Sequence, residues 1–226
     1  MTSALPPALP GTPLLAADPL LLQAVLPPGI ERLVFVDLET TGGSPVVHRA
    51  TEVGVIEVSS GGVREWSSLV NPQTPIPPFI QKLTGITDAM VQHAPTFSML
   101  AAELHARLDG ALFVAHNAPF DHGFLRQEFE RVGQVFEPRV VCTVKLSRKL
   151  FPEHERHNLD ALVQRHGLHL PEAERHRALG DARAVWHFWQ HVCRNLPQPT
   201  VHAALQPQLN AKRKAPRRPA LTTSST

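Results

Sequence analysis

The stretch VFVDLETTG, residues 34–42, places two carboxylates in what otherwise reads as a buried strand. Asp37 and Glu39 are two residues apart, so on an extended chain their side chains point to the same face. Like charges on one half-buried face repel each other and lose hydration. A bound cation would offset both costs, so this pair predicts a cation site.

Two later stretches offer further ligands. In HNAPFD, residues 116–121, Pro119 suits a first helical turn, so Asp121 falls near the positive end of a helix dipole and stays ionised readily. In HRALGD, residues 176–181, His176 and Asp181 are separated by about 140° around a regular helix. They can share a site if His176 lies in the loop before the helix, where it would be a mobile base beside a fixed ligand.

The ligand types indicate which cation would bind. Carboxylates without a cysteine or dense histidine cluster favour a hard, oxygen-preferring ion such as Mg²⁺ or Mn²⁺. Two such ions about 4 Å apart can activate water and stabilise the leaving oxygen of a phosphodiester. The chemistry predicted for these residues is therefore metal-assisted hydrolysis.

The elements that must position these residues follow from apolar periodicity. We expect strands at residues 33–38, 51–58, 63–70, 111–115 and 140–142. We expect helices at residues 96–108, 119–132, 143–151, 158–166 and 177–193, and a loop at residues 83–87. Three antiparallel strands followed by β-α units predict an α/β fold with a mixed five-stranded sheet flanked by helices.

Composition divides the chain into three parts. Residues 1–30 contain seven prolines and many leucines and are expected to be an N-terminal arm, with the catalytic domain at residues 31–195. Residues 196–226 are rich in proline and bases and are expected to be a disordered tail. The tail has five bases and no acid, whereas residues 1–195 have 17 bases against 20 acids. An acidic body argues against binding duplex DNA by charge alone.

Cellular location is suggested by what the sequence lacks. Its two cysteines, Cys142 and Cys193, are too few for a ligand cluster and are expected to be reduced core residues. The leucine-rich N-terminus is interrupted by Asp18, Pro19 and Gln23, which fits neither a secretory signal nor a membrane span. The expectation is a cytoplasmic protein without a membrane partner.

The three motifs together resemble those of the DEDDh, or DnaQ-like, 3′→5′ exonucleases. DLETTG, HNAPFD and HRALGDA match the family's motifs in order and spacing, and IPPFIQKLTGITDAMV resembles the segment between the first two. The similarity extends from about Arg32 to Asn195 and is greatest to the proofreading exonuclease of bacterial DNA polymerase III, the epsilon type. The resemblance implies a ribonuclease H-like fold.

The resemblance also implies residue roles. Asp37, Glu39, Asp121 and Asp181 would bind two divalent ions, with Asp37 bridging them, and His176 would be the general base. The residues expected near the terminal nucleotide are Thr40, Thr41, Leu83, His116 and Asn117. The implied activity is removal of nucleoside 5′-monophosphates from the 3′ end of DNA, in replication proofreading or repair.

Other readings remain open. The motifs do not separate DNA from RNA, so an exoribonuclease that trims RNA 3′ ends is one alternative. A non-catalytic subunit that binds a DNA polymerase or sliding clamp is another. Gln206–Leu209 (QPQL) is faintly similar to a clamp-binding peptide but lacks the aromatic anchor. Trp186 and Trp189, three residues apart on the last helix, are expected in the core.

Overall fold

A mixed β-sheet organises the structure, which is a computed structural model describing residues 14–15, 26–27 and 29–211. Its strand order is β1-β4-β3-β2-β5-β6. Strands β2, β3 and β4 pair antiparallel, whereas β5 runs parallel to both β2 and β6. The strands are β1 (Leu14–Leu15), β2 (Arg32–Thr40), β3 (Ala50–Ser59), β4 (Gly62–Leu69), β5 (Leu112–Ala115) and β6 (Arg139–Cys142).

The expected mixed sheet of five strands is confirmed by β2 to β6. The addition is β1, a two-residue strand within the expected N-terminal arm that pairs antiparallel with β4. The rest of that arm lies mostly outside the described residues. Two leucines without strong alternation carry too little pattern to predict a strand.

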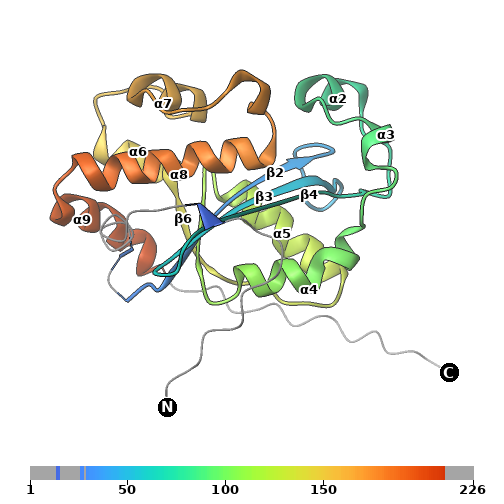
Figure 1. The fold of residues 1–226 in the computed structure, drawn as a ribbon, viewed down its shortest axis with the longest axis horizontal. Coiled ribbons are helices and arrows are strands. Elements are labelled where there is room, and N and C mark those ends of the chain that lie inside the picture. Colours follow the sequence, from blue (N-terminus) through green and yellow to red (C-terminus); the bar gives the residue numbers. More distant parts are fainter. Residues whose placement is uncertain (1–13, 16–25, 28, 212–226) are drawn as a thin grey trace, which may run out of the picture.

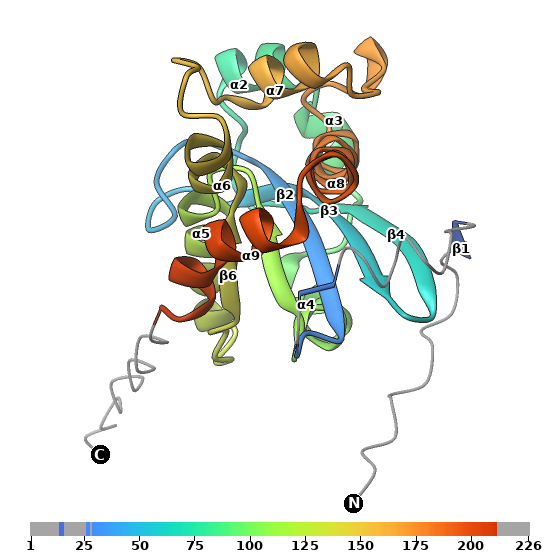
Figure 2. The same cartoon turned by 90° about the vertical axis from the view of Figure 1, so that its left-hand side faces the viewer.

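Helices cover both faces of the sheet (Figure 1). Helix α8 lies across one face and α4 and α5 lie on the other, as the turned view also shows (Figure 2). The helices are α2 (Pro78–Thr84), α3 (Asp88–Val91), α4 (Phe97–Leu108), α5 (Pro119–Arg131), α6 (Thr143–Leu150), α7 (Leu159–His166), α8 (Ala178–Asn195) and α9 (Gln198–Leu209).

Strand β2 supplies apolar side chains to both layers. Leu33 and Phe35 pack in the core beneath α8, where the Phe35 ring lies 5.1 Å from that of Trp186 and 5.7 Å from that of Trp189. Val34, Val36 and Leu38 pack in the core beneath α4 and α5. A central strand buried on both faces has this continuous apolar sequence. The two tryptophans are core residues, as expected.

In the segment between β4 and α4, residues 85–87 of the expected loop 83–87 are confirmed as a loop, whereas Leu83 and Thr84 belong to a helix that the sequence did not predict. The segment forms α2 and α3, which enclose a small separate core made by Ile76, Ile80, Ile86 and Val91. Pro78 starts α2, and Gly85, with φ of 72°, ends it in the left-handed conformation that glycine adopts at low cost. These helices are seven and four residues long, too short for helical periodicity to reveal them.

The expectation of a disordered tail from residue 196 was wrong for its first part. Residues 198–209 form α9, which buries Val201, Ala204 and Leu205. The Gln208 side chain accepts the N–H of Cys142 at 2.9 Å, so it pairs with the edge strand β6. The clamp-like peptide Gln206–Leu209 is thus part of α9, while residues 212–226 lie outside the described residues.

Both cysteines are free thiols, as expected, with Cys142 buried and Cys193 partly exposed. Across the described residues, every helix is too short or too polar to cross a membrane.

Candidate active site

The alternation of β2 carries the two motif carboxylates to the α8 side of the sheet. Asp37 and Glu39 continue the odd-numbered series that begins with Leu33 and Phe35, whose side chains contact α8. Leu38, between them, packs in the opposite core. The pair therefore faces the helix that follows the third motif.

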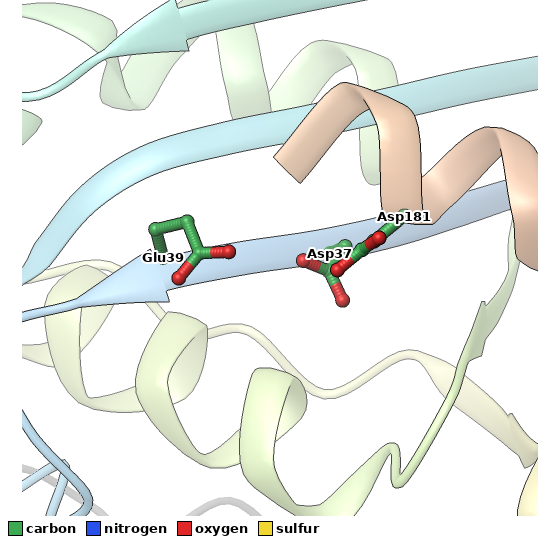
Figure 3. A group of neighbouring side chains, drawn as sticks. All are labelled: Asp37, Glu39 and Asp181. Carbon is green, nitrogen blue, oxygen red and sulfur yellow. The ribbon is translucent and has the colours of Figure 1, made fainter. Parts of the chain in front are cut away.

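The first turn of α8 brings Asp181 to this pair. The ligand oxygens of Asp37, Glu39 and Asp181 all lie within 4.8 Å of one another, and each residue is partly exposed. Figure 3 shows Asp181 descending from the helix onto Asp37, with Glu39 alongside on the same strand. Asp37 and Asp181, which are 144 positions apart in the sequence, thus belong to one acidic cluster together with Glu39.

Asp121 approaches the same strand from the other layer. It is 2% exposed at the start of α5, and its Oδ1 accepts the N–H of Leu38 at 3.2 Å. The paired register of β2 with β5 ends at Phe35 and Val114, so Leu38 needs another acceptor. Asp121 therefore adjoins the cluster, but its oxygens are not among those within 4.8 Å.

The electrostatics of the site show an excess of negative charge. Burial raises the pKa of Asp37 well above its usual range, and the nearby charges of Asp121 and Asp181 raise it further. Burial, followed by the charge of Asp181, raises the pKa of Glu39 to about 8. Burial also raises the pKa of Asp121 to about 8 and that of Asp181 to about 6, although His176 opposes the rise at Asp181. The expectation that Asp121 stays readily ionised was therefore wrong, because its burial outweighs the helix N-terminus.

These residues fit a hard divalent cation. The donors are all carboxylate oxygens, which Mg²⁺ and Mn²⁺ prefer. The pKa values of these carboxyl groups are raised because a bound proton removes the buried negative charge and its repulsion by the neighbouring carboxylates. A bound cation would offset the same negative charge in place of the protons. The metal dependence expected from the sequence is therefore consistent with the donor set.

His176 lies just outside α8, as its spacing from Asp181 required. Helix α8 begins at Ala178 with Arg177 as its N-cap, and His176 precedes them with φ of 55°. This left-handed conformation is uncommon for a residue other than glycine and is found often at functional sites. The side chain is exposed, which leaves it accessible to a substrate.

Thr40, the last residue of β2, and Thr41, which follows it, are buried. The Thr40 hydroxyl donates to the carbonyl oxygen of Gly42 at 2.8 Å. The Thr41 hydroxyl accepts the N–H of Arg49 at 3.0 Å, which closes the loop that follows β2. Their hydroxyls thus hold the local turn, and contact with a terminal nucleotide stays a prediction.

His116 and Asn117 form the turn between β5 and α5. The His116 Nδ1 lies 3.0 Å from the Thr143 hydroxyl, and burial lowers the pKa of His116 to about 4, so the ring is neutral. Asn117 has φ of 63°, and its carbonyl oxygen accepts the N–H of Phe120 at 2.9 Å. These contacts orient the start of the helix that carries Asp121; a contact with substrate stays a prediction.

Leu83, the remaining expected substrate contact, lies in the last turn of α2 rather than in a loop. Its side chain is 57% exposed, as is that of Phe79 one turn earlier at 68%. Its role beside a terminal base stays a prediction.

Sequence reasoning missed two buried acids that hold the surroundings of the site. Glu128 on α5 accepts from the Arg49 guanidinium at 2.8 Å and from the Ala50 N–H at 3.1 Å. Glu52 on β3 pairs with Arg177, which lies 125 residues away in the sequence. Each acid interrupts an otherwise apolar pattern, and this interruption could have indicated a buried, paired carboxylate. Nothing in the sequence identified the arginine partners.

A mixed sheet flanked by helices, with an acidic cluster at the end of its central strand, is a fold of the ribonuclease H-like class. Comparison with known families then gives the identity more closely. Residues 34–187 match the RNase_T family model, described as an exonuclease. The chain belongs to this DnaQ-like exonuclease family, as its three motifs predicted.

Several curated relatives share this region. The 3′-5′ exonuclease DinG of Bacillus subtilis is 37% identical over 177 residues, which are 76% of this chain and 19% of that protein. The DNA polymerase III subunit epsilon-like protein of Rhodobacter capsulatus is 40% identical over 162 residues, covering 69% of this chain and 23% of that protein. The chain therefore spans about a fifth to a quarter of the length of these relatives.

Solved structures agree with the fold. Exonuclease X in complex with 5′ overhanging duplex DNA superimposes with a TM-score of 0.60 at 25% identity, covering 76% of this chain and 98% of that one. E. coli exonuclease I in complex with a dT13 oligonucleotide gives a TM-score of 0.67 at 18% identity, covering 78% of this chain and 43% of that one.

Proposed function

We propose that this domain is a two-metal-ion 3′→5′ exonuclease that hydrolyses phosphodiesters at the 3′ end of DNA and releases nucleoside 5′-monophosphates. The observation that carries the proposal is the cluster of Asp37, Glu39 and Asp181, whose oxygens lie within 4.8 Å of one another. The Bacillus relative is named a 3′-5′ exonuclease, which supports the proposed direction of cleavage. The exonuclease I structure is a complex with a dT13 oligonucleotide, which supports DNA as the substrate.

In this proposal the chain supplies the ligands and the general base. Asp37, Glu39 and Asp181 would hold Mg²⁺ or Mn²⁺, and Asp121 would contribute its Oδ2 because its Oδ1 already accepts the Leu38 N–H. When bound, the cations supply activation of water and neutralisation of charge at the scissile phosphate. His176, exposed before α8, accepts a proton from the attacking water.

A polymerase partner is a further part of the proposal. Its support is the name of the Rhodobacter relative, an epsilon-like subunit of DNA polymerase III. The clamp-like peptide gives no support to a clamp partner, because Gln208 is hydrogen-bonded to Cys142 and the Leu209 side chain packs against the core.

The test is a gel assay on 5′-labelled single-stranded DNA and RNA of matched sequence, with Mg²⁺ or Mn²⁺. We expect DNA to shorten stepwise from its 3′ end and the product to be nucleoside 5′-monophosphate. Asp181→Asn should abolish the reaction, because it removes a charge from the cluster. Asp109→Asn, at the exposed end of α4, is the matched control and should keep full activity.

Other results would redirect the assignment. Preferential shortening of RNA would move the domain to trimming of RNA 3′ ends. Absence of cleavage on both substrates in the wild-type protein would leave a non-catalytic subunit as the better description.

A further inference from the structure

An ion pair between a buried carboxylate and a partly exposed guanidinium connects the start of α8 to β3. Arg177, the N-cap of α8, donates from Nη2 to Glu52 Oε1 at 2.6 Å and from Nε to Glu52 Oε2 at 3.0 Å. Glu52 is 4% exposed. A two-point arginine–carboxylate contact fixes direction as well as distance, so it holds the guanidinium in one orientation.

The same carboxylate also binds the helix backbone. Glu52 Oε2 accepts the N–H of Ala178, the first residue of α8, at 3.0 Å. The first N–H groups of a helix have no partner within the helix, and a negative charge there is stabilising. Glu52 therefore acts as an N-cap supplied by a neighbouring strand.

The strand and the helix are also in direct backbone contact. A Cβ added to Gly54, two residues along β3, would lie 2.3 Å from the carbonyl carbon of Ala178. The first turn of α8 thus rests on β3 without an intervening side chain. Its position is set jointly by that contact and by Glu52.

The Glu52–Arg177 ion pair lies between the two segments that carry the acidic cluster. Glu52 is the register partner of Glu39 in the β2–β3 ladder. Arg177 follows His176 directly, and its carbonyl oxygen accepts the N–H of Asp181 at 3.0 Å. One ion pair thus connects the strand next to Asp37 and Glu39 with the segment that carries His176 and Asp181.

We propose that Glu52 and Arg177 are positioning residues for hydrolysis, which hold His176 and Asp181 at a fixed place relative to Asp37 and Glu39. The inference rests on the proposed exonuclease function and deepens it. Neither side chain needs to touch substrate, because both act through the segment 176–181. Arg177 also keeps the Glu52 carboxylate engaged with α8.

The test compares this pair with a matched pair on the same helix. Arg183 makes the same two-point contact with Glu65 on β4, at 2.9 and 2.6 Å, and its Nη1 also pairs with Glu174 at 2.7 Å, a residue outside the segment 176–181. The variants are Glu52→Gln, Arg177→Gln and their double, against Glu65→Gln and Arg183→Gln. The substrate is the p-nitrophenyl ester of thymidine 5′-monophosphate with saturating Mn²⁺, which reports the chemical step without a polymer.

We expect each substitution in the first pair to lower kcat by about 10- to 100-fold, as loss of an outer contact to a ligand-bearing segment does. KM should change little, because substrate contacts are unaltered. The double variant should be no slower than the slower single variant, since both remove one interaction. The control pair should stay within about threefold of wild type. Unchanged kcat in the first pair, or equal losses in the control pair, would overturn the proposal.

A second readout does not depend on activity. Amide hydrogen exchange at residues 178–181 should be faster in Glu52→Gln and unchanged in Glu65→Gln, because only the first loosens the start of α8. Equal exchange in both would count against this role of the Glu52–Arg177 ion pair. If Arg177→Gln fails to fold, Arg177→Lys keeps the charge and loses the two-point contact, and should show the same loss of kcat. A wild-type protein that cleaves neither ester nor DNA would refute the proposed function, while hydrogen exchange would still decide whether Glu52 holds the helix.

Discussion

At the residue scale, the site concentrates carboxylates where burial disfavours their charge. Asp37 and Asp121 are held by the folded chain close to Asp181, and each has a pKa above the usual carboxyl range. Such an arrangement reduces the stability of the metal-free protein and favours cation binding. The acidic cluster therefore destabilises the metal-free fold, although the proposed chemistry requires it.

The pH dependence of stability follows from these shifts. Glu39 and Asp121 have folded-state pKa values of about 8, above the ordinary value of about 4 in the unfolded chain. Between these two values the folded state binds more protons than the unfolded chain. The free energy of unfolding therefore falls as pH rises through about 8. The buried His116 does not titrate in this range, because burial lowers its pKa to about 4. We expect the Tm of the protein in EDTA to fall from about pH 7 to pH 9.

Divalent cation should reverse this trend, because it competes with protons for the same oxygens. The rise in Tm on adding Mn²⁺ should be larger at pH 8.5 than at pH 6.5, as differential scanning calorimetry can measure. Glu39→Gln should flatten both profiles. A metal-free Tm that increases between pH 7 and pH 9 would contradict the assignment of the raised pKa values.

Asp121 has a structural task that can be separated from its proposed chemical one. In Asp121→Asn the remaining Oδ1 can still accept the Leu38 N–H, so the free energy of unfolding should stay close to wild type while exonuclease activity is lost. Asp121→Ala leaves that buried N–H unpaired and should cost about 1–3 kcal/mol as well. Urea unfolding and the gel assay measure the two effects. Equal stability of the two variants would show that the hydrogen bond contributes little.

At the element scale, α9 is part of the folded domain although its sequence suggests a tail. Its proline, glutamine and alanine content weakens the apolar pattern, yet Val201 and Leu205 are buried against the α8 side of the sheet. Gln208 adds an edge contact to β6. The folded domain therefore extends at least to Leu209.

Leu205→Ala should destabilise the protein by about 2–5 kcal/mol, the usual cost of emptying a buried leucine site. Met99→Ala is the control, because Met99 is a large apolar residue in a helix but is 73% exposed. It should change the unfolding free energy by less than about 0.5 kcal/mol. Chemical denaturation measures both, and a small effect of Leu205→Ala would mean that α9 contributes little to folding.

At the scale of the whole molecule, charge is divided unevenly along the chain. Residues 1–195 have 17 bases and 20 acids, while five bases follow near the C-terminus. A nuclease with an acidic body gains little affinity for a polyanion from that body. The C-terminal bases can supply the missing attraction.

Replacing these five bases by glutamine should weaken binding to single-stranded DNA and reduce its dependence on salt. Each lost phosphate contact lowers the slope of log K against log salt by about 0.7. Fluorescence anisotropy on a labelled oligothymidylate measures the slope, with Asp181→Asn present in both proteins to prevent cleavage. The same slope with and without the bases would exclude this role. The bases are Lys212, Arg213, Lys214, Arg217 and Arg218.

The sequence by itself determined the parts of this protein that depend on local pattern. Apolar patterns predicted strands β2 to β6 and helices α4 to α8. Continuous apolar runs indicated strands buried on both faces, such as β2 and β5, and amphipathic patterns indicated helices packed on one face. Spacing predicted that Asp37 and Glu39 share a face and that His176 precedes its helix. The family motifs predicted the acidic cluster as a whole.

Only the tertiary structure decided which distant residues meet. Helix α9 and the short helices α2 and α3 depend on packing against surfaces made by other segments, so their own periodicity did not reveal them. Glu52 and Arg177 form their ion pair across 125 residues, and Asp121 accepts the Leu38 N–H because β5 ends before β2 does. Hydrogen bonds and ion pairs of this kind depend on distances in space, which residue types and local periods do not contain.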